Sequence, residues 1–530
     1  MRMKKLIYTT AAVSILIAGF SSCKKSTFDI NKNPNQATDS TVSYDVILPA
    51  ALHSTGALVA TNWGFLQNWM GYWARSGTYA PSVIEETYQI TTTFGNGIWN
   101  GAYDNAFDYH VMQLKAKRAG ATYYEGIARI MKAHAFQMLV DVYGNVPYFD
   151  ALQGNANPTP KYDQGAAIYK DLFRQVDTAI TLIKGATATL NKDIATNDIM
   201  FAGDKTKWAR FGNTLKLRML VHLMNGGILS PQSVVPGFDI AGELAKITAE
   251  GSGYLGAGEN AQVNPGYKSD KPNPFYTTYK NTVAGVATAN NIYYRANEWG
   301  IDYYTYNGDP RRSRFYVASA NGYLGVKYGL PPVTENAADQ LAAIGPALGS
   351  SNTASQPIMT ASESFFLQAE ARQRGFITSG STAKDLLETA IIQNFLVVGL
   401  TAADANTYMT NNAGYPDVDI TAGPLAAGLP GGGLFTIISQ KWFALNGLNT
   451  LETWTDWRRV NYSASTPTFV YGAGVGYDPG PAISVSPQNT SNRIPVRLLY
   501  PQTEYNYNPE NVGAQGTISQ FTSRVFWDLQ

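Results

Sequence analysis

The sequence is poor in metal-binding and cross-linking residues, with one cysteine, Cys23, and four histidines in 530 residues. A single cysteine excludes a disulfide framework, and no Cys/His spacing typical of a structural zinc site is present. An excess of one charge is also missing, because 40 lysines and arginines stand against 39 aspartates and glutamates. This balance excludes the basic surface that nucleic-acid binding or a polybasic membrane-binding segment requires.

Sequence motifs of catalysis are absent as well. The chain contains no HExxH, GxSxG or GxxxxGK[ST] motif, and it lacks the alternation of strands and helices that a barrel enzyme would show. Paired acids such as Glu85 and Glu86 keep glycoside hydrolysis open as a weaker alternative. The four histidines all lie in helical patterns with apolar neighbours, where core histidines are more common than bases or metal ligands: His53, His110, His134 and His222. We therefore predict a non-catalytic protein with no metal and no cofactor.

No stretch of the chain has eighteen uninterrupted apolar residues, and the longest apolar run lies at the N-terminus. A basic segment, residues 1–5, precedes apolar residues 6–20, and Ser21, Ser22 and Cys23 follow. This order is typical of a secretory signal and too short for a membrane span. Because the small residues abut the lone cysteine, the segment resembles a bacterial lipoprotein signal, although ordinary secretion remains an alternative. We predict a signal peptide over residues 1–22.

In this interpretation Cys23 becomes the acylated first residue of the mature protein. Residues 23–43 are polar and short of apolar side chains, so they form a flexible tether and not a folded element. The acyl chains would then be the only attachment of the protein to a membrane.

The clearest helical pattern in the chain runs into Gly144. Apolar residues Ile127, Met131, Met138 and Val142 lie on one face at helical spacing. Gly144 can take the left-handed conformation just beyond a helix end, and Pro147 prevents the helix from resuming. A second amphipathic helix is predicted from about residue 166 to 184, so the two form a helical hairpin.

Similar pairs of helices recur along the chain. Thr360 and Glu363 have the spacing of a capping box, which predicts where one of these helices begins. Four hairpins indicate an all-α dominated fold, a tetratricopeptide-like solenoid without a strict repeat length. The other predicted helices cover about residues 44–74 with 99–117, 207–223 with 239–249, and 359–375 with 383–396.

The sequence is rich in aromatic residues that could bind a ligand, with 33 tyrosines and 10 tryptophans. Residues 251–357 lose helical periodicity and are rich in glycine, proline and tyrosine, so we predict a long irregular insertion. Sugar rings stack against aromatic faces, while hydroxyl and amide groups bind sugar hydroxyls. A structural role remains equally open for any one aromatic. The candidate glycan-binding residues are Trp73, Tyr79, Tyr276, Tyr279, Trp299, Tyr303 and Tyr304.

Several longer stretches carry a resemblance to a known family. They are DVYGNVPYFDAL (141–152), MTASESFFLQAEA (359–371), QKWFALNGLNTLETWTDWRRVNY (440–462) and IPVRLLYPQTEYNYN (494–508). They resemble the SusD-like (SusD/RagB) outer-membrane nutrient-binding lipoproteins, and most closely the second SusD-like subfamily.

The resemblance implies a single SusD-like domain over residues 44–530. Its helical hairpins would cover 44–250 and 358–400, its loop-rich insertion 251–357, and its C-terminal helix and loops 401–530. The arginines Arg458 and Arg459 near Glu452 and Asp456 would form a structural ion-pair set of this scaffold.

The resemblance also implies a function at the cell surface. Such a protein is lipid-anchored in the outer membrane, captures oligosaccharides, and delivers them to a SusC-like TonB-dependent transporter. Capture of a peptide or another non-sugar nutrient for the same kind of transporter is the alternative, and a purely structural partner of the transporter is a third. The sequence names neither the sugar nor its linkage, and it contains no EF-hand spacing for a calcium ion.

Overall fold

The computed structural model describes residues 42–224, 233–264, 266–423, 432–460, 483–491 and 493–529. The predicted signal peptide, Cys23 and nearly all of the predicted tether lie outside these residues. From Tyr44 onward the described residues form one compact unit. Among them, no helix is both long enough and apolar enough to cross a membrane.

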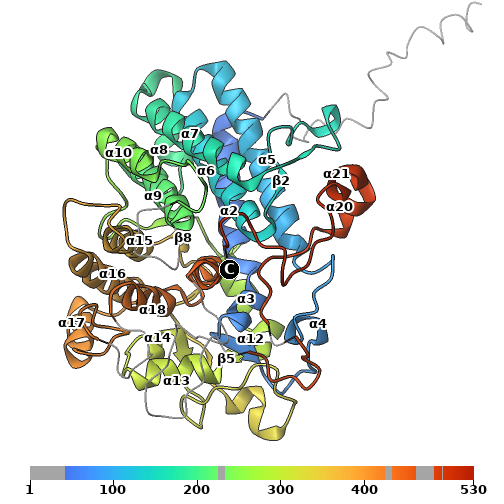
Figure 1. Cartoon of the computed structure of the whole chain (residues 1–530), viewed down its shortest axis with the longest axis vertical. Coiled ribbons are helices and arrows are strands. Elements are labelled where there is room, and N and C mark those ends of the chain that lie inside the picture. The colour runs from blue at the N-terminus through green and yellow to red at the C-terminus, as the bar shows by residue number, and fades with distance from the viewer. Residues whose placement is uncertain are drawn as a thin grey trace, which may run out of the picture. The chain divides into compact units, whose positions relative to one another are not determined.

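Antiparallel helices packed side by side form the first half of this unit (Figure 1). Helix α6 is central, with α5 against one side and α7 against the other, and almost every residue of α6 is buried. Helix α2 packs on α5, and α9 packs on α7. The α2–α5 and α6–α7 neighbours confirm two of the predicted hairpins, and contacts of α9 with α10 and of α15 (Ala361–Gln373) with α16 (Ala383–Val397) confirm the other two. The helices are α2 (Tyr44–Thr61), α5 (Asn96–Ala119), α6 (Thr122–Tyr143), α7 (Gly165–Lys184), α8 (Ile194–Asn197), α9 (Lys205–Leu223) and α10 (Ile240–Glu250).

The end of α6 shows why the predicted boundary is correct. Gly144 has a φ of 77°, a conformation that a side chain would strain, and its N–H donates to the Val140 carbonyl at 2.8 Å. The chain then enters a short strand, Val146–Pro147. Glycine therefore ends this helix for a conformational reason that the sequence already carries.

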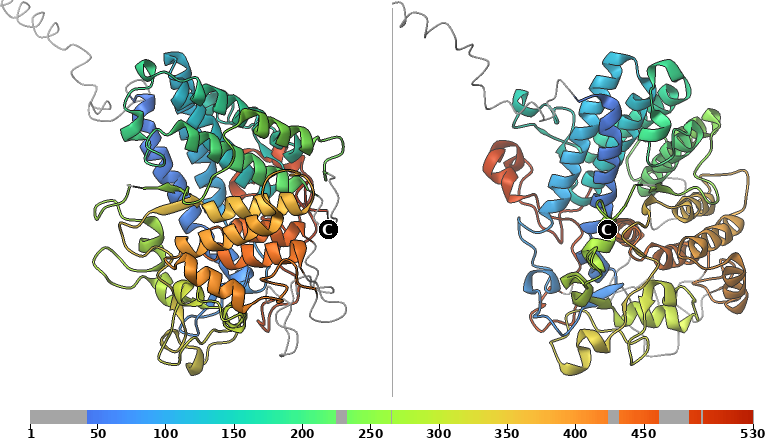
Figure 2. Two further views of the ribbon diagram at one scale, coloured as in Figure 1. Left: turned by 90° about the vertical axis from the view of Figure 1, so that its left-hand side faces the viewer. Right: turned by 180° about the vertical axis from the view of Figure 1, so that it is seen from behind.

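A second group of helices forms the other half of the unit, next to the first (Figure 2). The hydroxyl of Thr360 caps α15 by accepting from the Glu363 N–H at 3.2 Å. The Glu363 carboxylate does not complete a capping box, because it pairs with Arg218 of α9 instead. The helices of this group are α15 (Ala361–Gln373), α16 (Ala383–Val397), α17 (Ala402–Asn411), α18 (Gly433–Leu445) and α19 (Thr450–Arg459). Two short helices, α20 (Gln502–Tyr507) and α21 (Pro509–Gly513), lie apart from them on the side of α5 (Figure 1).

The prediction of one helix from 44 to 74 is wrong in its second half. Helix α2 ends at Thr61, α3 covers only Gly64–Trp69, and β1 follows at Trp73–Arg75. Gly71, with φ 77°, separates α3 from β1, and the Trp299 ring lies so close that a Cβ on Gly71 would be 2.6 Å from it. Tertiary packing of the indole on this turn overrides the local helical pattern.

The insertion is also more ordered than its sequence indicates. It contains short helices and strands, which present buried side chains on more than one face and so show no helical periodicity. Its helices are α11 (Pro274–Tyr279), α12 (Ala289–Tyr293), α13 (Glu298–Tyr306) and α14 (Arg312–Phe315), and α4 (Val83–Glu86) lies earlier in the chain.

Short strands in the described part pair as four antiparallel two-stranded ribbons. The pairs are β1 with β5 (Tyr294–Ala296), β2 (Val146–Pro147) with β3 (Tyr162–Asp163), β4 (Ala261–Val263) with β8 (Gln356–Met359), and β6 (Tyr316–Val317) with β7 (Ala343–Ile344). The β1–β5 and β4–β8 ribbons join distant parts of the chain, so they fix the insertion onto the helical scaffold.

Candidate functional site

The β1–β5 ribbon brings two aromatic loops together. Its register pairs Trp73 with Ala296 and Arg75 with Tyr294. Because the strands are antiparallel, β1 leaves the ribbon at the end where β5 enters it. The next pair continues the contact, since the Ser76 N–H donates to the Tyr293 carbonyl at 2.8 Å. The loop after β1 and helix α12 before β5 therefore adjoin.

Tyr79 and Tyr293 lie on these two segments and form what we call the tyrosine platform. Their ring centroids are 5.4 Å apart, and the ring planes are inclined by 57°. Both side chains are partly exposed. The Tyr79 hydroxyl donates to the Ala289 carbonyl at 3.3 Å, which fixes its ring on α12. The platform thus presents two aromatic rings at an angle on loops that tertiary contacts hold in place.

Two neighbouring arginines organise these loops. Arg75 donates to the Tyr79 carbonyl at 2.8 Å and to the Leu330 carbonyl at 2.9 Å, and it forms a buried ion pair with Glu86 at 2.5 Å. Arg295, opposite on β5, donates to the Ala338 carbonyl at 2.7 Å. Because both guanidinium groups are occupied by the protein, they brace the platform and do not offer positive charge to an anionic ligand.

A third loop closes against the platform at Gly77. Its N–H donates to the Asn336 carbonyl at 2.6 Å, and a Cβ at Gly77 would be 1.6 Å from the Asn336 Oδ1 atom. The Thr78 hydroxyl accepts from the Ala338 N–H at 2.9 Å. Val333 of this loop is 50% exposed, as is Val83 of α4 at 53%. The third loop and α4 therefore each carry an exposed apolar side chain.

Glu85 of α4 is the titratable group of this region. The Asn68 amide donates to its Oε1 atom at 2.6 Å, and the Tyr328 hydroxyl donates to the same atom at 3.4 Å. Its carboxyl group is enclosed by protein, and this burial raises the pKa of Glu85 to about 7. Glu85 and Glu86 do not act as a catalytic pair, because Glu86 is held by Arg75.

Three of the predicted glycan-binding aromatics lie in the core. Trp299 is 7% exposed, and Tyr303 and Tyr304 have no exposed surface. Their rings pack around α18, where the Tyr303 and Phe443 ring centroids are 4.4 Å apart and the Tyr304 hydroxyl donates to the Phe443 carbonyl at 2.7 Å. In this structure these side chains join the insertion to the scaffold and offer little or no surface to a ligand.

The remaining candidates divide between the interior and the surface. Trp73 and Tyr279 are 1% and 4% exposed, and their ring centroids are 5.3 Å apart. Tyr276 is partly exposed, and its hydroxyl accepts from the Asn281 amide at 3.5 Å. Of the seven predicted residues, Tyr79 and Tyr276 are therefore the two partly exposed ones, and only Tyr79 belongs to the platform.

Tyr293 is a platform residue that the sequence prediction did not select. It belongs to the aromatic-rich stretch of the insertion, next to Tyr294, whose ring packs on buried Trp73 at 5.4 Å. Tyr293 is the last residue of α12 and Tyr294 the first of β5, and their ring centroids are 4.8 Å apart. The local enrichment in aromatic residues pointed to this stretch, but it did not distinguish Tyr293 from its neighbours.

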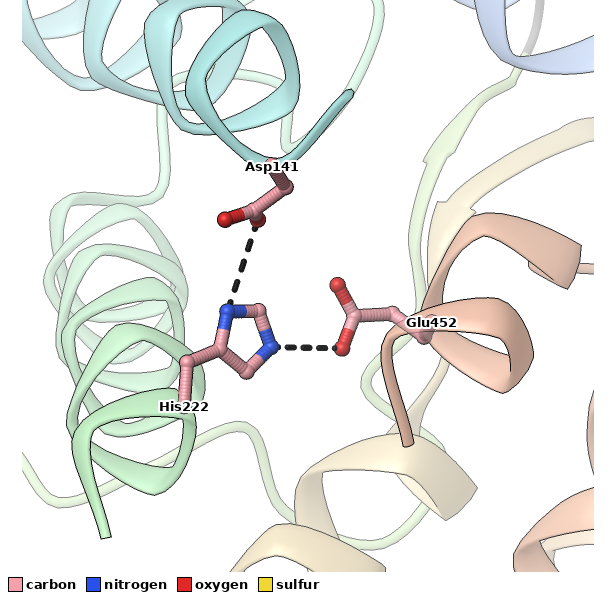
Figure 3. A group of neighbouring side chains, drawn as sticks. All are labelled: Asp141, His222 and Glu452. Carbon is pink, nitrogen blue, oxygen red and sulfur yellow. Dashed lines mark hydrogen bonds and ion pairs between the residues drawn. The ribbon is translucent and has the colours of Figure 1, made fainter. Parts of the chain in front are cut away.

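Within the described residues, one group of side chains has the composition of a metal site (Figure 3). His222 lies between two acids, with Nδ1 3.4 Å from Asp141 and Nε2 3.0 Å from Glu452. Each carboxylate faces a different nitrogen of the imidazole ring. A metal ion bound to one ring nitrogen would therefore lie beside only one of the two carboxylates. Asp141 also accepts from the Trp527 indole at 2.8 Å and from the Tyr169 hydroxyl at 2.5 Å. The geometry fits an imidazolium held by two carboxylates better than it fits a metal.

This histidine belongs to a buried chain of ion pairs that crosses the molecule. Arg218 lies 3.6 Å from Glu452 and Lys441 lies 4.0 Å from it, while Arg459 joins Asp456 to Glu370 at 2.7 and 2.5 Å. The members are five acids, Asp141, Glu363, Glu370, Glu452 and Asp456, and five bases, His222, Arg218, Arg374, Lys441 and Arg459. The charges balance only if His222 is protonated.

The electrostatics of the chain agree with that balance. Burial alone would lower the pKa of His222, but the carboxylates of Glu452 and Asp141 outweigh it and raise the pKa to about 9. The predicted ion-pair set is confirmed for Arg459 with Asp456, whereas Arg458 donates to the backbone carbonyl of Asp141 at 2.6 Å. The network is structural, because its members bind one another.

Comparisons with known proteins place the chain among binding proteins of the outer membrane. Residues 34–501 match the family SusD-like_2, described as "Starch-binding associating with outer membrane". No curated protein matches the sequence. Solved structures share the fold, as judged by TM-scores near 0.7 at low sequence identity, so the predicted fold class is confirmed.

Three of these structures illustrate the similarity. An outer-membrane protein of Bacteroides vulgatus described in terms of nutrient binding has a TM-score of 0.69 at 20% identity, over 92% of this chain and 100% of its own. A chitin-binding SusD homolog from Flavobacterium johnsoniae has a TM-score of 0.69 at 21% identity, over 92% of this chain and 99% of its own. A SusD homolog from Bacteroides fragilis has a TM-score of 0.69 at 19% identity, over 92% of this chain and 99% of its own.

Proposed function

The chain belongs to the SusD-like family of starch-binding proteins that associate with the outer membrane, and on that premise we propose that it captures oligosaccharides at the cell surface for a SusC-like TonB-dependent transporter. Members of this family bind nutrients and do not convert them, so the protein is not an enzyme. The ligand class, the transporter partner and the lipid anchor at Cys23 are parts of the proposal.

The tyrosine platform is the observation that carries the glycan assignment. Two partly exposed aromatic rings, Tyr79 and Tyr293, lie 5.4 Å apart on loops braced by buried arginines. An aromatic face suits the C–H faces of a sugar ring, and such a contact is worth about 1 kcal/mol, by analogy with aromatic pairs. Because the loops are already ordered, little conformational entropy is lost when a ligand binds.

The comparisons support a glycan without naming it. The Flavobacterium johnsoniae relative is described as chitin-binding, and the family is described as starch-binding. The two polymers differ in linkage and in their acetamido groups. The common requirement is a set of aromatic rings in loops, which the platform meets, so we propose a neutral oligosaccharide as the ligand class.

Glycan-array binding by the soluble chain lacking residues 1–23 tests the proposal. We expect Tyr293→Ala and Tyr79→Ala each to weaken binding about 5- to 10-fold, which corresponds to about 1 kcal/mol of stacking for each ring. Tyr507→Ala is the matched control, because Tyr507 is 76% exposed on α20, away from the platform. Trp73 and Trp299 are unsuitable for this test, since they are buried and their loss would disturb folding.

The outcomes separate the candidate functions. Binding that is lost in the platform variants and kept in the control supports glycan capture at the platform. Glycan binding that is unchanged in both platform variants contradicts the assigned site. If no glycan on the array binds and peptides do, capture of a peptide nutrient replaces the proposal.

A further inference from the structure

A polar cavity of about 320 Å³ lies apart from the tyrosine platform, where the insertion meets the second group of helices. We call it the amide cavity. The loops at 347–350 and 354–357, strand β4, Phe275 of α11, the end of α16 and the α18–α19 turn line it. A cavity of this size falls at the lower end of the range of small-ligand pockets, about 300–1,000 Å³.

The polar side chains that line the amide cavity keep unused hydrogen-bonding capacity. Asn260 accepts from the Ala361 N–H at 2.9 Å through Oδ1, which leaves its amide N–H groups available. Gln356 donates to the Pro357 carbonyl at 3.1 Å, which leaves its Oε1 available. The Gln262 side chain makes no hydrogen bond within the part of the chain that the structure describes, and Ser350 is exposed at the rim. The cavity therefore offers both donors and acceptors.

The charges around the amide cavity restrict the ligand. No charged side chain lines it. An anion or a cation would be desolvated there without a partner, and a purely apolar ligand would leave the amides unpaired, both at a cost in free energy. Phe275 adds one aromatic side chain to the wall. The lining therefore suits a neutral molecule that carries several hydroxyl groups.

A small inner cavity continues from the amide cavity into the core. It has a volume of about 30 Å³, room for about one water molecule, and it shares Phe275, Gly447 and Leu448 with the outer cavity. Trp73 and Thr450 line it, and the Trp73 Nε1 and Thr450 Oγ1 atoms are buried with no hydrogen-bond partner. A water molecule or a polar group of a ligand in the inner cavity could form hydrogen bonds with these two atoms.

The loop that forms the mouth is held before any ligand binds. The Asn273 amide donates to the Ala354 carbonyl at 2.9 Å, and its N–H donates to the Asn352 carbonyl at 2.7 Å. Gly349 has a φ of 53°, and a Cβ there would be 2.8 Å from the Phe275 ring. Space is also tight at Gly447, where an added Cβ would be 2.2 Å from the Leu348 side chain. The shape of the cavity is therefore built into the fold.

We infer that the amide cavity is a second saccharide site, which takes one terminal ring of a neutral sugar end-on. Gln262, Gln356 and Asn260 bind hydroxyl groups of the ring. The choice of a sugar among neutral polyhydroxyl compounds rests on the proposed function. The site itself is separate from the platform, because none of the platform residues lines it.

Monosaccharide binding by the full-length chain, in a detergent without a sugar headgroup, tests this inference. The probes are D-glucose, D-galactose, D-mannose, D-xylose and N-acetyl-D-glucosamine, observed by saturation-transfer NMR and titrated. We expect Gln262→Leu, which keeps the side-chain volume and removes the amide, to weaken binding at least fivefold. Ser350→Phe, a substitution of an exposed loop residue, fills the mouth and should have the same effect. Tyr79→Ala with Tyr293→Ala should leave this binding intact.

Each result decides between the two sites. Binding of a monosaccharide that is lost in the cavity variants and kept in the platform double variant supports the inference. Binding that depends on the platform and not on Gln262 or Ser350 overturns it. If none of the five monosaccharides binds while the glycan array still detects platform-dependent binding, the amide cavity is not a saccharide site and the proposed function stands.

Discussion

At the scale of single residues, adjacent side chains of the same type make different contacts in this protein. Tyr293 lies on the tyrosine platform, while Tyr294 packs on Trp73. Glu86 is neutralised by Arg75, while Glu85 accepts hydrogen bonds from neutral groups only. Contacts with distant segments make the difference, since Tyr294 meets Trp73 and Glu86 meets Arg75. Composition alone could therefore not select the surface aromatics.

Glu85 makes the protein less stable as the pH rises. The pKa of Glu85 is raised by burial to about 7, from 4.5 in the unfolded chain, so the folded state prefers the protonated form. The contribution of the protonated Glu85 carboxyl group to the free energy of unfolding is fully present below pH 4.5. It is lost as the pH rises through 7, which lowers the free energy of unfolding by about 3 kcal/mol. We predict that Glu85→Gln equals the wild type at pH 4.5 and exceeds it at pH 8, as measured by urea unfolding.

Glu86→Gln provides a control of opposite sign. This substitution leaves Arg75 without its ion-pair partner in a buried position, so it should lower the free energy of unfolding at both pH values, by about 3–5 kcal/mol. If Glu85→Gln is less stable than the wild type at pH 8, the carboxyl group of Glu85 is not destabilised by burial and the interpretation fails.

At the scale of elements, the buried ion-pair chain joins helices that are distant in sequence. His222 of α9 contacts Asp141 of α6 and Glu452 of α19, and Arg218 of α9 pairs with Glu363 of α15. Each carboxylate is held by a cation from another helix. Removing one partner would leave a buried charge uncompensated, so these pairs fix how the two groups of helices meet.

A change of pH can test whether His222 carries a positive charge in the buried ion-pair chain. The pKa of His222 rises from 6.5 in the unfolded chain to about 9 in the fold, so its contribution of about 3 kcal/mol is fully present below pH 6.5 and is lost as the pH rises through 9. We predict that His222→Gln lowers the free energy of unfolding by about 3–5 kcal/mol at pH 6. The difference from the wild type should shrink at pH 9.5.

His134→Gln is the matched control for this measurement. His134 is also a buried histidine of the helical scaffold, but burial lowers the pKa of His134 to about 3, so it carries no charge at pH 6. At pH 6 the unfolded wild type binds a proton at His134 that the fold excludes. Any deficit of His134→Gln should therefore be smaller at pH 6 than at pH 9.5, by about 1 kcal/mol, a pH dependence opposite in sign to that of His222→Gln. A His222→Gln deficit that is equally large at pH 6 and pH 9.5 would show that His222 is neutral in the fold.

At the scale of the whole molecule, we propose that the protein combines an N-terminal acylation signal with a compact binding unit. The unit begins at Tyr44 and has no helix suited to cross a membrane in its described part. The proposal assigns membrane attachment to acyl chains on Cys23. Capture and anchoring are then separable properties of the chain.

We predict that Cys23→Ser separates them. The variant should lose incorporation of a radiolabelled fatty acid and move from the outer-membrane fraction to the soluble fraction, because no other attachment is proposed. It should bind the same glycans on the array as the wild type. Retention of Cys23→Ser in the membrane fraction would point to the transporter or another contact as the anchor.

The sequence by itself determined the helical hairpins, the cap at Thr360 and the glycine stop at Gly144, because these depend on residues close together in the chain. It also carried the family resemblance that the match over residues 34–501 confirms. Local periodicity is enough for such features, since the pattern that makes a helix amphipathic also shows which face is buried.

Only the tertiary structure decided which aromatic residues reach the surface. Tyr303 and Tyr304 pack beneath α18, whereas Tyr293 meets Tyr79 across a ribbon whose strands are more than two hundred residues apart. The protonated His222 and the amide cavity likewise depend on residues from several elements. Burial and charge pairing between distant segments are properties of the folded chain, because they arise only when those segments come into contact.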